Sequence, residues 1–501
     1  MSVAGSVRVI PLSYRLRDRV RLDDIGGGRW RAICDLPLSV VSINAAAARL
    51  LTLTLGGVGV TALAAALSVD EERVLKLCEY FRGKGMLDVT SAPPDPPVTP
   101  MVSVIVPTKD REAALDECLA ALFALDYPPD RYEVIVVDDG STDGTVAVAG
   151  RYPCHLVSNN RNRGQSYSRN AGAQKASGEI FAFLDSDCVA EPGWLRDLVP
   201  FFSWSRVAAV GGYVAGYYGE SRIDRYEQVA SPLNMGGRLL LAADDPGTFY
   251  VPTCNLLVRH VAYVAVGGIR EDLRVGEDVD LCWRLRARGD YLLYAPMGSV
   301  RHKHRNRLGA MLRRRAEYGT SEAKLHQLHP EKRKRFGLTR YPVVTFATLA
   351  AALIGRQPWL LAACLLPILW DGSSRLLHLR REGVRVPRRW VWFAVLRGHL
   401  STSYFLFFHL VRYYLLLMVA AGFVLPSLWL FAGFAVLYTS VVDFSVKHPR
   451  LWYPTFLCFY LAEHAAYQAG VLAGCIRSRS FRSYVPTFRR PRARLAPGDS
   501  A

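Results

Sequence analysis

Two aspartates separated by a single residue stand directly after an apolar run near the middle of the sequence. Asp185 and Asp187 follow Phe181–Leu184 in the segment GEIFAFLDSDC, and this run predicts a buried β-strand. Side chains at positions i and i+2 of an extended segment share a face, so both carboxylates point the same way. Such a pair can hold Mn²⁺ or Mg²⁺ against the oxygens of a diphosphate. Asp-x-Asp alone is a weak signal, and its place at a strand end is what indicates metal-assisted phosphate chemistry.

Two earlier apolar runs also end in polar residues. VSVIVPTKD ends in Pro107 and Thr108, and EVIVVDDGSTDGT delivers Asp138 and Asp139 before a glycine-rich turn. Ligands of open α/β sheets bind at the carboxyl ends of strands. The two acids can therefore accept hydrogen bonds from a nucleoside base or ribose. The alternative is that they only form an Asp-Gly turn and a helix N-cap.

Two further segments carry charged residues suited to the same chemistry. Arg169, in NRGQSYSRNAG, can pair with a phosphate or simply cap a surface helix. Glu277 and Asp278 open the amphipathic segment GEDVDLCWRLRARG, which predicts a helix. An acid at this place can act as a general base for a hydroxyl group. Favourable interaction with the helix dipole would also explain both acids without any catalysis.

The composition sets limits on the class of protein. The chain has 501 residues, a formal net charge of +18 and 50% hydrophobic residues, which excludes a disordered or collagen-like chain. Its mean hydropathy of +0.11 directs attention to membrane segments. The excess of Lys and Arg over Asp and Glu favours phosphate-bearing substrates or an anionic membrane surface as partners. We expect no nucleic-acid partner. The ten cysteines form no C-x-x-C pair, so a reduced cytosolic interior is expected.

The chain divides by composition into five parts. The Pro-rich stretch SAPPDPPVTP predicts a stiff linker, and the region after it alternates strand-like and helix-like runs, as in an α/β domain with a mostly parallel sheet. The predicted parts are an N-terminal unit (1–90), the linker (91–100), the α/β domain (101–338), an apolar helical region (339–480) and a basic tail (481–501).

Three apolar runs in the C-terminal third are candidates for membrane association. The first run, Tyr341–Trp370, is broken near Pro358 into halves that are each too short to span a membrane. The second, Tyr413–Val442, carries no charge and suits one span or a hairpin. The third, Leu451–Ile476, is long enough to span but contains Glu463 and His464, which are costly in lipid unless paired. A buried helical subdomain is the alternative. The flanking Arg-rich stretches favour the cytosolic side. The first twenty residues hold no apolar core of signal-peptide length. We therefore expect a cell-membrane protein with a cytoplasmic catalytic domain.

The order of these motifs resembles that of family 2 glycosyltransferases with the GT-A fold, over residues 101–305. The matching segments are VIVPTKDR, VIVVDDGSTDGT, NRGQSYSRNAG, FLDSDC and GEDVDLCWRL. The resemblance implies a metal-dependent, inverting transfer from a nucleoside-diphosphate sugar. It makes Pro107, Thr108, Asp138, Asp139, Arg169 and Asp185 donor-binding residues and Asp278, with Glu277, the base. Metal ligands would be Asp185 and Asp187, with His302 or His304 as a third ligand or a phosphate contact. The Q-x-x-R-W motif of processive polysaccharide synthases is absent from the sequence.

The N-terminal unit, from about Val9 to Val89, resembles PqqD-like winged-helix domains, which recognise peptides that are being modified. The pieces that carry the likeness begin at Asn44 and Lys84, and the segment predicts short strands, an Asn-initiated helix and two amphipathic helices ending at Gly85. Any small three-helix domain is the alternative. The order of PqqD-like unit, transferase and apolar region is similar to that of the mycofactocin glycosyltransferases.

That family resemblance implies transfer of glucose from UDP-glucose to premycofactocin, a peptide-derived small-molecule acceptor, to build a β-1,4-linked oligoglucoside. Neither the sugar nor the acceptor follows from the residues themselves. Two other classes stay open: a membrane glycosyltransferase that makes a cell-envelope polysaccharide or glycolipid, and a non-catalytic scaffold that binds nucleotide sugars. The intact Asp185, Asp187 and Asp278 argue against the scaffold. The expected fold is thus α/β, with a GT-A domain, an N-terminal winged-helix-like domain and a C-terminal apolar helical membrane region.

Overall fold

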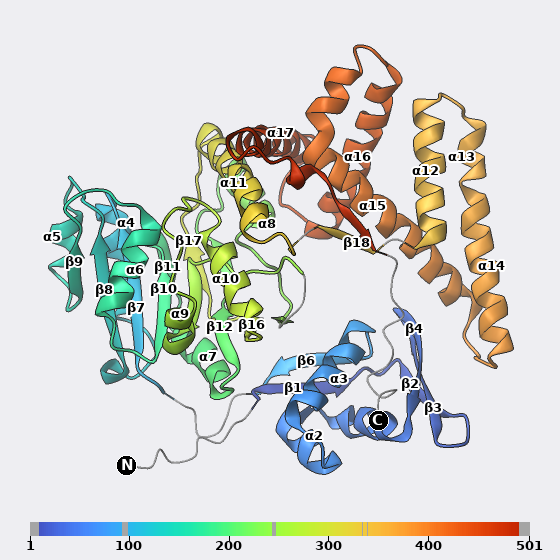
Figure 1. Ribbon diagram of the computed structural model, residues 1–501, viewed down its shortest axis with the longest axis horizontal. Coiled ribbons are helices and arrows are strands. Elements are labelled where there is room, and N and C mark those ends of the chain that lie inside the picture. Colours follow the sequence, from blue (N-terminus) through green and yellow to red (C-terminus); the bar gives the residue numbers. More distant parts are fainter. Residues whose placement is uncertain (1–9, 93–98, 243–246, 333, 338, 490–501) are drawn as a thin grey trace. The chain divides into compact units, whose positions relative to one another are not determined.

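The structure is a computed structural model that describes residues 10–92, 99–242, 247–332, 334–337 and 339–489. By internal contacts the chain forms two units (Figure 1). The first comprises residues 1–8, 93–334 and 446–485, and the second comprises residues 9–92, 335–445 and 486–501. The two units are described separately below.

The first unit is built on an eight-stranded sheet with the order β14-β16-β12-β15-β10-β7-β8-β9. Strands β10, β7, β8 and β9 run parallel, whereas β15 is antiparallel to both of its neighbours. The expected mostly parallel sheet is therefore mixed. In sheet order, the strands span Leu240–Ala242, Tyr291–Tyr294, Val207–Gly211, Asn255–Arg259, Ile180–Leu184, Val102–Thr108, Tyr132–Asp138 and His155–Ser158.

Burial explains why the central strands read as continuous apolar runs. Every residue of β7 and β10 is buried, as expected of strands covered on both faces. Helix α6 (Gln165–Lys175) lies close against β7 and β8, and a Cβ at Gly172 would come within 2.6 Å of Ile105 and 3.0 Å of Val137. The sheet's helices also include α4 (Glu112–Leu122), α5 (Thr145–Ala149), α7 (Trp194–Leu198), α9 (His260–Ala265) and α10 (Glu277–Ala287).

A second, three-stranded sheet adjoins the carboxyl end of β10. Its order is β11-β17-β13, from strands Cys188–Ala190, Val300–His302 and Val214–Gly216. The register places Cys188 opposite His302 and Gly216 beside His302. This short sheet therefore brings the segment after Asp187 next to the two predicted histidines.

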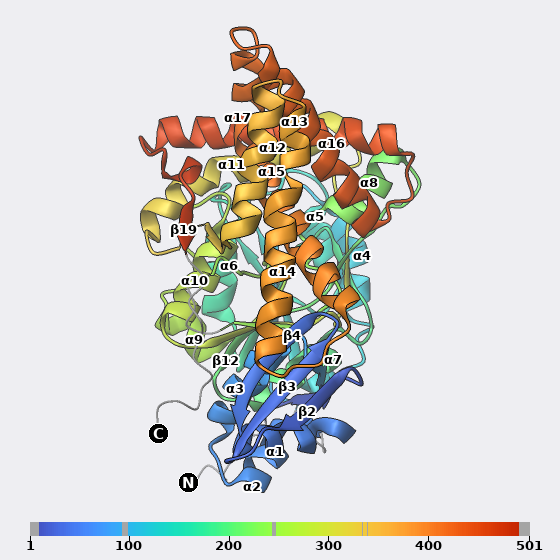
Figure 2. The ribbon, with the colours of Figure 1, turned by 90° about the vertical axis from the view of Figure 1, so that its right-hand side faces the viewer.

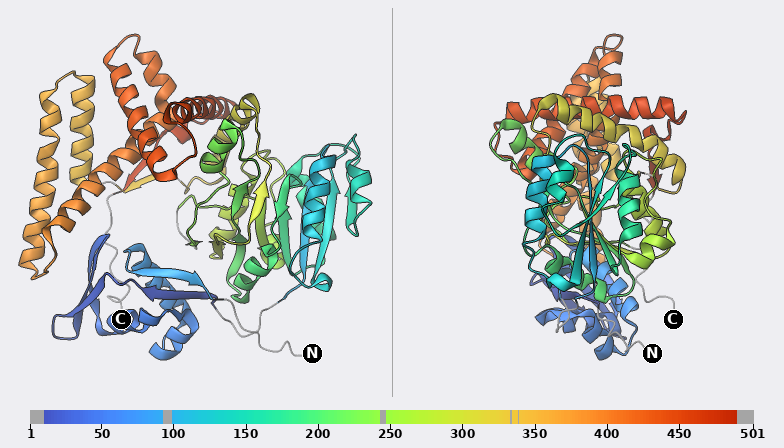
Figure 3. Two further views of the ribbon diagram at one scale, coloured as in Figure 1. Left: turned by 180° about the vertical axis from the view of Figure 1, so that it is seen from behind. Right: turned by 90° about the vertical axis from the view of Figure 1, so that its left-hand side faces the viewer.

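Helices α8 (Arg222–Ala230), α11 (Leu308–Leu328) and α17 (Tyr453–Arg477) complete the first unit. Both views of Figure 3 show α11 and α17 side by side. Buried Glu463 accepts a hydrogen bond from Tyr226 (2.9 Å) and lies 3.5 Å from Arg315 Nε. The acid in the predicted apolar run Leu451–Ile476 is thus paired within the protein, and this helix is not one of the candidate membrane spans found among the described residues.

Gly470 makes the close approach of α11 and α17 possible. A Cβ at Gly470 would lie 1.9 Å from the carbonyl oxygen of Ala316, whereas a Cβ at Gly309, in the same helix pair, meets nothing within 4 Å. We expect Gly470→Ala to destabilise the protein by about 1–3 kcal/mol, because the helix backbones must move apart. Gly309→Ala is the matched control and should be neutral or slightly stabilising. Thermal unfolding of the detergent-solubilised chain measures both, and equal midpoints for the two variants would contradict this packing.

In the second unit, the N-terminal part holds two small sheets and three α-helices. Helix α1 (Ala45–Leu53) begins as predicted at Asn44, whose Oδ1 accepts a hydrogen bond from the backbone N–H of Ala47 (2.9 Å). Helices α2 (Val60–Leu67) and α3 (Glu71–Gly83) follow. The sheets comprise β5-β1-β6 (Val58–Gly59, Leu12–Leu16, Leu87–Ser91) and β2-β3-β4 (Val20–Asp24, Arg29–Asp35, Leu38–Asn44). Figure 2 shows α1, α2 and α3 with strands β2, β3 and β4.

The described residues include three helices long and apolar enough to cross a membrane: Trp359–Arg381, Arg388–Ala421 and Ser427–Lys447. Of the two arrangements expected for the uncharged run Tyr413–Val442, one span or a hairpin, the structure shows the hairpin, because α15 ends at Ala421 and α16 begins at Ser427. The expectation for Tyr341–Trp370 is wrong in one respect. The chain does break after α12 (Arg340–Ile354), but α13 and α14 carry the second half on to Arg381, which makes it long enough to span.

Candidate active site

The first element of the site is the pair of aspartates at the end of β8. Both carboxylate oxygens of Asp139 accept backbone hydrogen bonds, from Arg163 and from Gly164 (2.8 Å each), and Asn159 Nδ2 donates to Oδ1 (2.9 Å). The Asp138 carboxylate accepts from the backbone N–H of Ser141 (3.1 Å), which closes the Asp-Gly turn. Asp138 therefore shapes the loop, while Asp139 joins the end of β8 to the loop before α6.

Pro107 and Thr108 end the adjacent strand β7, in register with β8. Thr108 is buried, and its hydroxyl has no hydrogen-bond partner among the residues that the structure describes. A buried hydroxyl without a partner costs free energy. This hydroxyl, at the carboxyl end of β7, is therefore available to a ligand.

Arg169 connects the two acidic motifs. Its guanidinium is 1% exposed and lies 2.5 Å from Asp185 Oδ1 and 3.0 Å from Glu277 Oε1. Gln165 Nε2 also donates to Glu277 (2.7 Å). A buried cation requires anionic partners, so these carboxylates are its counterions, and the contact of Arg169 with a phosphate stays a prediction. Burial by itself would raise the pKa of Asp185, but the Arg169 charge outweighs it and lowers that pKa below its ordinary value.

The second aspartate of Asp-x-Asp faces a different group. Asp187, Cys188 and His302 each offer a ligand atom, and these atoms lie within 4.8 Å of one another. His302 Nε2 is 3.5 Å from Asp187 Oδ1. The carboxylate of Asp187 suits Mn²⁺ or Mg²⁺ and the imidazole of His302 suits a transition metal, whereas the thiol of Cys188 is a soft group that suits neither ion. Asp187 and His302 are therefore the members of this set that fit the predicted cation, with Mn²⁺ the better match. Asp185 completes the motif nearby, with one oxygen on Arg169.

Two details of this cluster differ from the sequence-based interpretation. His304 is not in it: its Nε2 lies 3.1 Å from Asp224 Oδ1 at the start of α8. Cys188 is in it and was not among the predicted residues. Its place directly after Asp187 was the available signal, but only the pairing of β11 with β17 puts it opposite His302. Burial raises the pKa of the Cys188 thiol well above its ordinary value, so it stays protonated near neutral pH.

Asp278 opens helix α10, next to the Arg169-bound Glu277. Burial, and then the charge of Glu277, raises the pKa of Asp278 to about 7. Asp280, a further acid that the sequence did not single out, is fully buried and accepts from Arg284 Nε (2.7 Å) and lies 2.8 Å from His329 Nε2. These contacts fix the first turn of α10. A carboxyl group that titrates near the working pH is well suited to general base catalysis.

This pKa gives a pH dependence. The base must be ionised, so we expect activity to be lost as the pH falls through about 7, with kcat/KM dropping about tenfold per pH unit below it. Above this point the rate should reach a plateau. A pH profile of kcat/KM in the full-length protein measures this limb. A profile that is flat from pH 5 to pH 8 would show that Asp278 is not the titrating base.

Comparison with known proteins places this site in a class. Residues 103–266 match the family model described as "Glycosyl transferase family 2". This part of the chain, with its mixed α/β sheet and strand-end acids, is therefore similar to family 2 glycosyltransferase domains, and its sheet has the mixed α/β arrangement of a GT-A-like fold.

Particular relatives are known from several organisms. The chain is 35% identical over 254 residues to "Pre-mycofactocin glycosyltransferase" of Mycobacterium tuberculosis, which covers 49% of this chain and 53% of that protein. It is 33% identical to "Glycosyltransferase AglE" of Haloferax volcanii, over 38% of this chain and 61% of that one. The chain thus spans about half the length of the first of these relatives. Among solved structures, a mannosyltransferase from Pyrobaculum calidifontis with GDP-Man and Mn²⁺ matches with a TM-score of 0.40 and 20% identity, over 70% of this chain and 98% of that one.

Proposed function

We propose that this protein is a metal-dependent, inverting glycosyltransferase that moves glucose from UDP-glucose to a peptide-derived acceptor of the premycofactocin type, in a β-1,4 linkage. The observation that carries the enzymatic part is the Arg169 bridge. The buried guanidinium lies 2.5 Å from Asp185 in the metal motif and 3.0 Å from Glu277 in the base motif. Both motifs therefore share one preorganised site. The finer part, donor and acceptor, is supported by the likeness to the M. tuberculosis protein.

The chain's own residues divide the work as follows. Thr108 and Asp139 lie at adjacent strand ends, where a nucleoside would bind. Asp185, Asp187 and His302 would hold the cation, which offsets the charge of the leaving diphosphate when it is bound. Asp278 would take the proton from the acceptor hydroxyl as the new bond forms on the opposite face of the sugar, which inverts the anomeric carbon. Arg169 pairs with Glu277 and keeps α10 in position.

The N-terminal unit is proposed to recognise the acceptor or its precursor peptide, in line with its PqqD-like sequence and its Asn-capped helix α1. The candidate membrane helices would keep the enzyme at the cell membrane with its catalytic domain in the cytoplasm. A membrane transferase of cell-envelope polysaccharide or glycolipid synthesis is the second candidate, and the same helices favour it. The two candidates differ in the acceptor alone.

Assays of the full-length protein with several donors and acceptors test the proposal. UDP-glucose, UDP-galactose and GDP-mannose are compared with premycofactocin or a lipid-phosphate acceptor, and products are identified by mass spectrometry. We expect glucose transfer from UDP-glucose to premycofactocin with Mn²⁺ or Mg²⁺, and a β-1,4 linkage in the NMR spectrum of the product. Transfer to the lipid acceptor alone would favour the second candidate. Absence of any donor turnover would leave the scaffold interpretation.

A further inference from the structure

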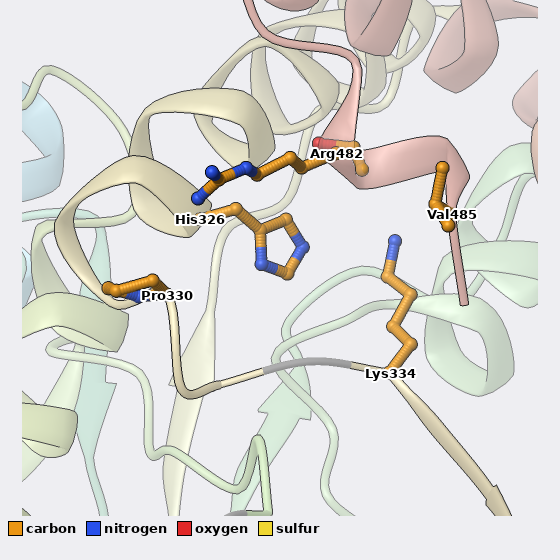
Figure 4. A pocket seen from close by; sticks show the side chains of 6 residues that line it. His326, Pro330, Lys334, Arg482 and Val485 are labelled. Atoms are coloured by element: carbon orange, nitrogen blue, oxygen red, sulfur yellow. The ribbon is translucent and has the colours of Figure 1, made fainter. Parts of the chain in front are cut away.

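A small pocket in the first unit is formed by two segments that are far apart in the sequence (Figure 4). One segment is the end of α11 with the residues after it, and the other is the 3₁₀ turn Arg482–Tyr484. The cavity volume is about 170 Å³, several times the roughly 30 Å³ of a water molecule in the liquid. Its lining residues are His326, Pro330, Lys334, Arg482, Ser483 and Val485.

Two of the six lining residues, Lys334 and Arg482, are cationic. In Figure 4 the Lys334 ammonium points into the pocket, and the Arg482 guanidinium extends beside His326. Lys334 Nζ lies 2.6 Å from Glu322 Oε2, so one cation is balanced in part. Arg482 is exposed and pairs with no carboxylate among the described residues. The pocket therefore has an excess of positive charge, which attracts an anion.

Ser483 supplies a second, independent observation. Its side chain is 1% exposed, yet its hydroxyl has no nitrogen or oxygen partner in the part of the chain that the structure describes. The Cys475 thiol, a weakly polar group, is its neighbour. Buried hydroxyl groups are normally satisfied. The only partner of this hydroxyl among the described residues is the Cys475 sulfur, which is a weak acceptor, so an oxygen of a ligand in the pocket would be a stronger acceptor for it.

The residues on either side of the turn favour a lipid as the source of that oxygen. Phe481 is 55% exposed and Val485 is 67% exposed, so apolar side chains flank Arg482 and Ser483 at the pocket edge. Apolar and cationic side chains alternate in this way where a protein meets the boundary between headgroups and acyl chains. The Arg-rich stretch that begins at Arg477 contributes further positive charge along the sequence.

We infer that this pocket binds a phosphate group, and that its natural source is the headgroup of an anionic phospholipid. Arg482 and Lys334 contact the phosphate oxygens, Ser483 donates a hydrogen bond, and Phe481 and Val485 contact the acyl chains. This site lies apart in sequence from the donor motifs between Val102 and Asp278. It does not depend on the proposed sugar transfer.

Isothermal titration of the full-length protein in a non-ionic detergent tests this inference. The probes are dihexanoyl phosphatidylglycerol, dihexanoyl phosphatidylcholine and inorganic phosphate. Arg482→Gln removes a cation that has no carboxylate partner, and Ser483→Ala removes the buried hydroxyl. Arg151→Gln is the matched control, because Arg151 is an exposed arginine in another part of the unit, 3.9 Å from Asp116.

We expect phosphatidylglycerol to bind more tightly than phosphatidylcholine. Arg482→Gln should weaken this binding about fivefold, as loss of one cation near an anionic lipid does, and Ser483→Ala should weaken it too, with Arg151→Gln unchanged. Binding should also weaken as salt is raised. If inorganic phosphate binds as tightly as phosphatidylglycerol, the lipid source is overturned in favour of a soluble phosphate compound. If Arg482→Gln and Ser483→Ala bind all probes like the wild type, the site itself is overturned.

Discussion

Replacing Asp278 by Asn is expected to lower kcat by roughly 10²–10⁴-fold, because an amide cannot accept the proton of the acceptor hydroxyl. The substitution preserves the shape of the side chain at the start of α10. The contacts of Asp139 and Thr108 at the strand ends are untouched, so donor affinity should change little. The variant should also lose the pH dependence near 7 that Asp278 confers on the wild type.

Steady-state kinetics and calorimetric titration with UDP-glucose separate these effects. Asp290→Asn is a matched control, since Asp290 follows α10, lies 3.2 Å from Arg288 and has no place in the site. It should keep wild-type turnover. A collapse of donor binding in Asp278→Asn, with turnover of the remaining bound donor intact, would mean that Asp278 has only a structural role at the helix N-terminus.

Replacing Asp187 by Ala is expected to reduce transfer on the order of 10²–10³-fold, the usual cost of removing one preorganised electrostatic contact to the developing charge. Asp187 is the carboxylate that lies within 4.8 Å of the ligand atoms of His302 and Cys188. Its loss should therefore weaken Mn²⁺ binding as well as turnover. Electron paramagnetic resonance of Mn²⁺ titrated into the protein gives the affinity without reference to activity.

The fold should survive this change. Asp187 lies 3.7 Å from Arg111 and 3.5 Å from His302, but Asp185 and not Asp187 balances the buried Arg169. Asp197→Ala, at an acid on α7 beside Arg196, serves as the control and should bind Mn²⁺ normally. Full activity of the wild type in EDTA would contradict the metal role of the whole cluster.

Local pattern was enough to find the strands that carry the site. The runs at Val102–Thr108, Tyr132–Asp138 and Ile180–Leu184 are buried on both faces, which is why they read as uninterrupted apolar segments. Their ends bear the predicted polar residues because strand ends are where a sheet can expose polar groups. The helix that begins at Asn44 and the hairpin between Ala421 and Ser427 follow from short-range capping and turn chemistry in the same way.

Local sequence patterns could not predict which side chains that are distant in sequence pair with one another. Arg169 and Glu277 are 108 residues apart, and no local pattern indicates that one buried cation balances acids from two motifs. His302 and His304 look equivalent in VRHKHR, but the register of β17 puts one beside Asp187 and the other on Asp224. His302 is the last residue of β17 and is paired with Cys188, whereas His304 lies beyond the strand. Two residues separate them, so only a two-residue shift of register would bring His304 to the place of His302.

The sequence by itself determined three features: acidic residues at strand ends, the alternation of apolar and polar segments, and long apolar helices. Each depends on residues that are close together in the chain. The tertiary structure alone decided which of these residues meet. It paired Glu463 with Arg315 and so placed α17 against α11, and it gave Arg169 its two carboxylates. The physical reason is the high cost of burying an unpaired charge: each buried ion must find a counterion, and only the folded chain determines which one it is.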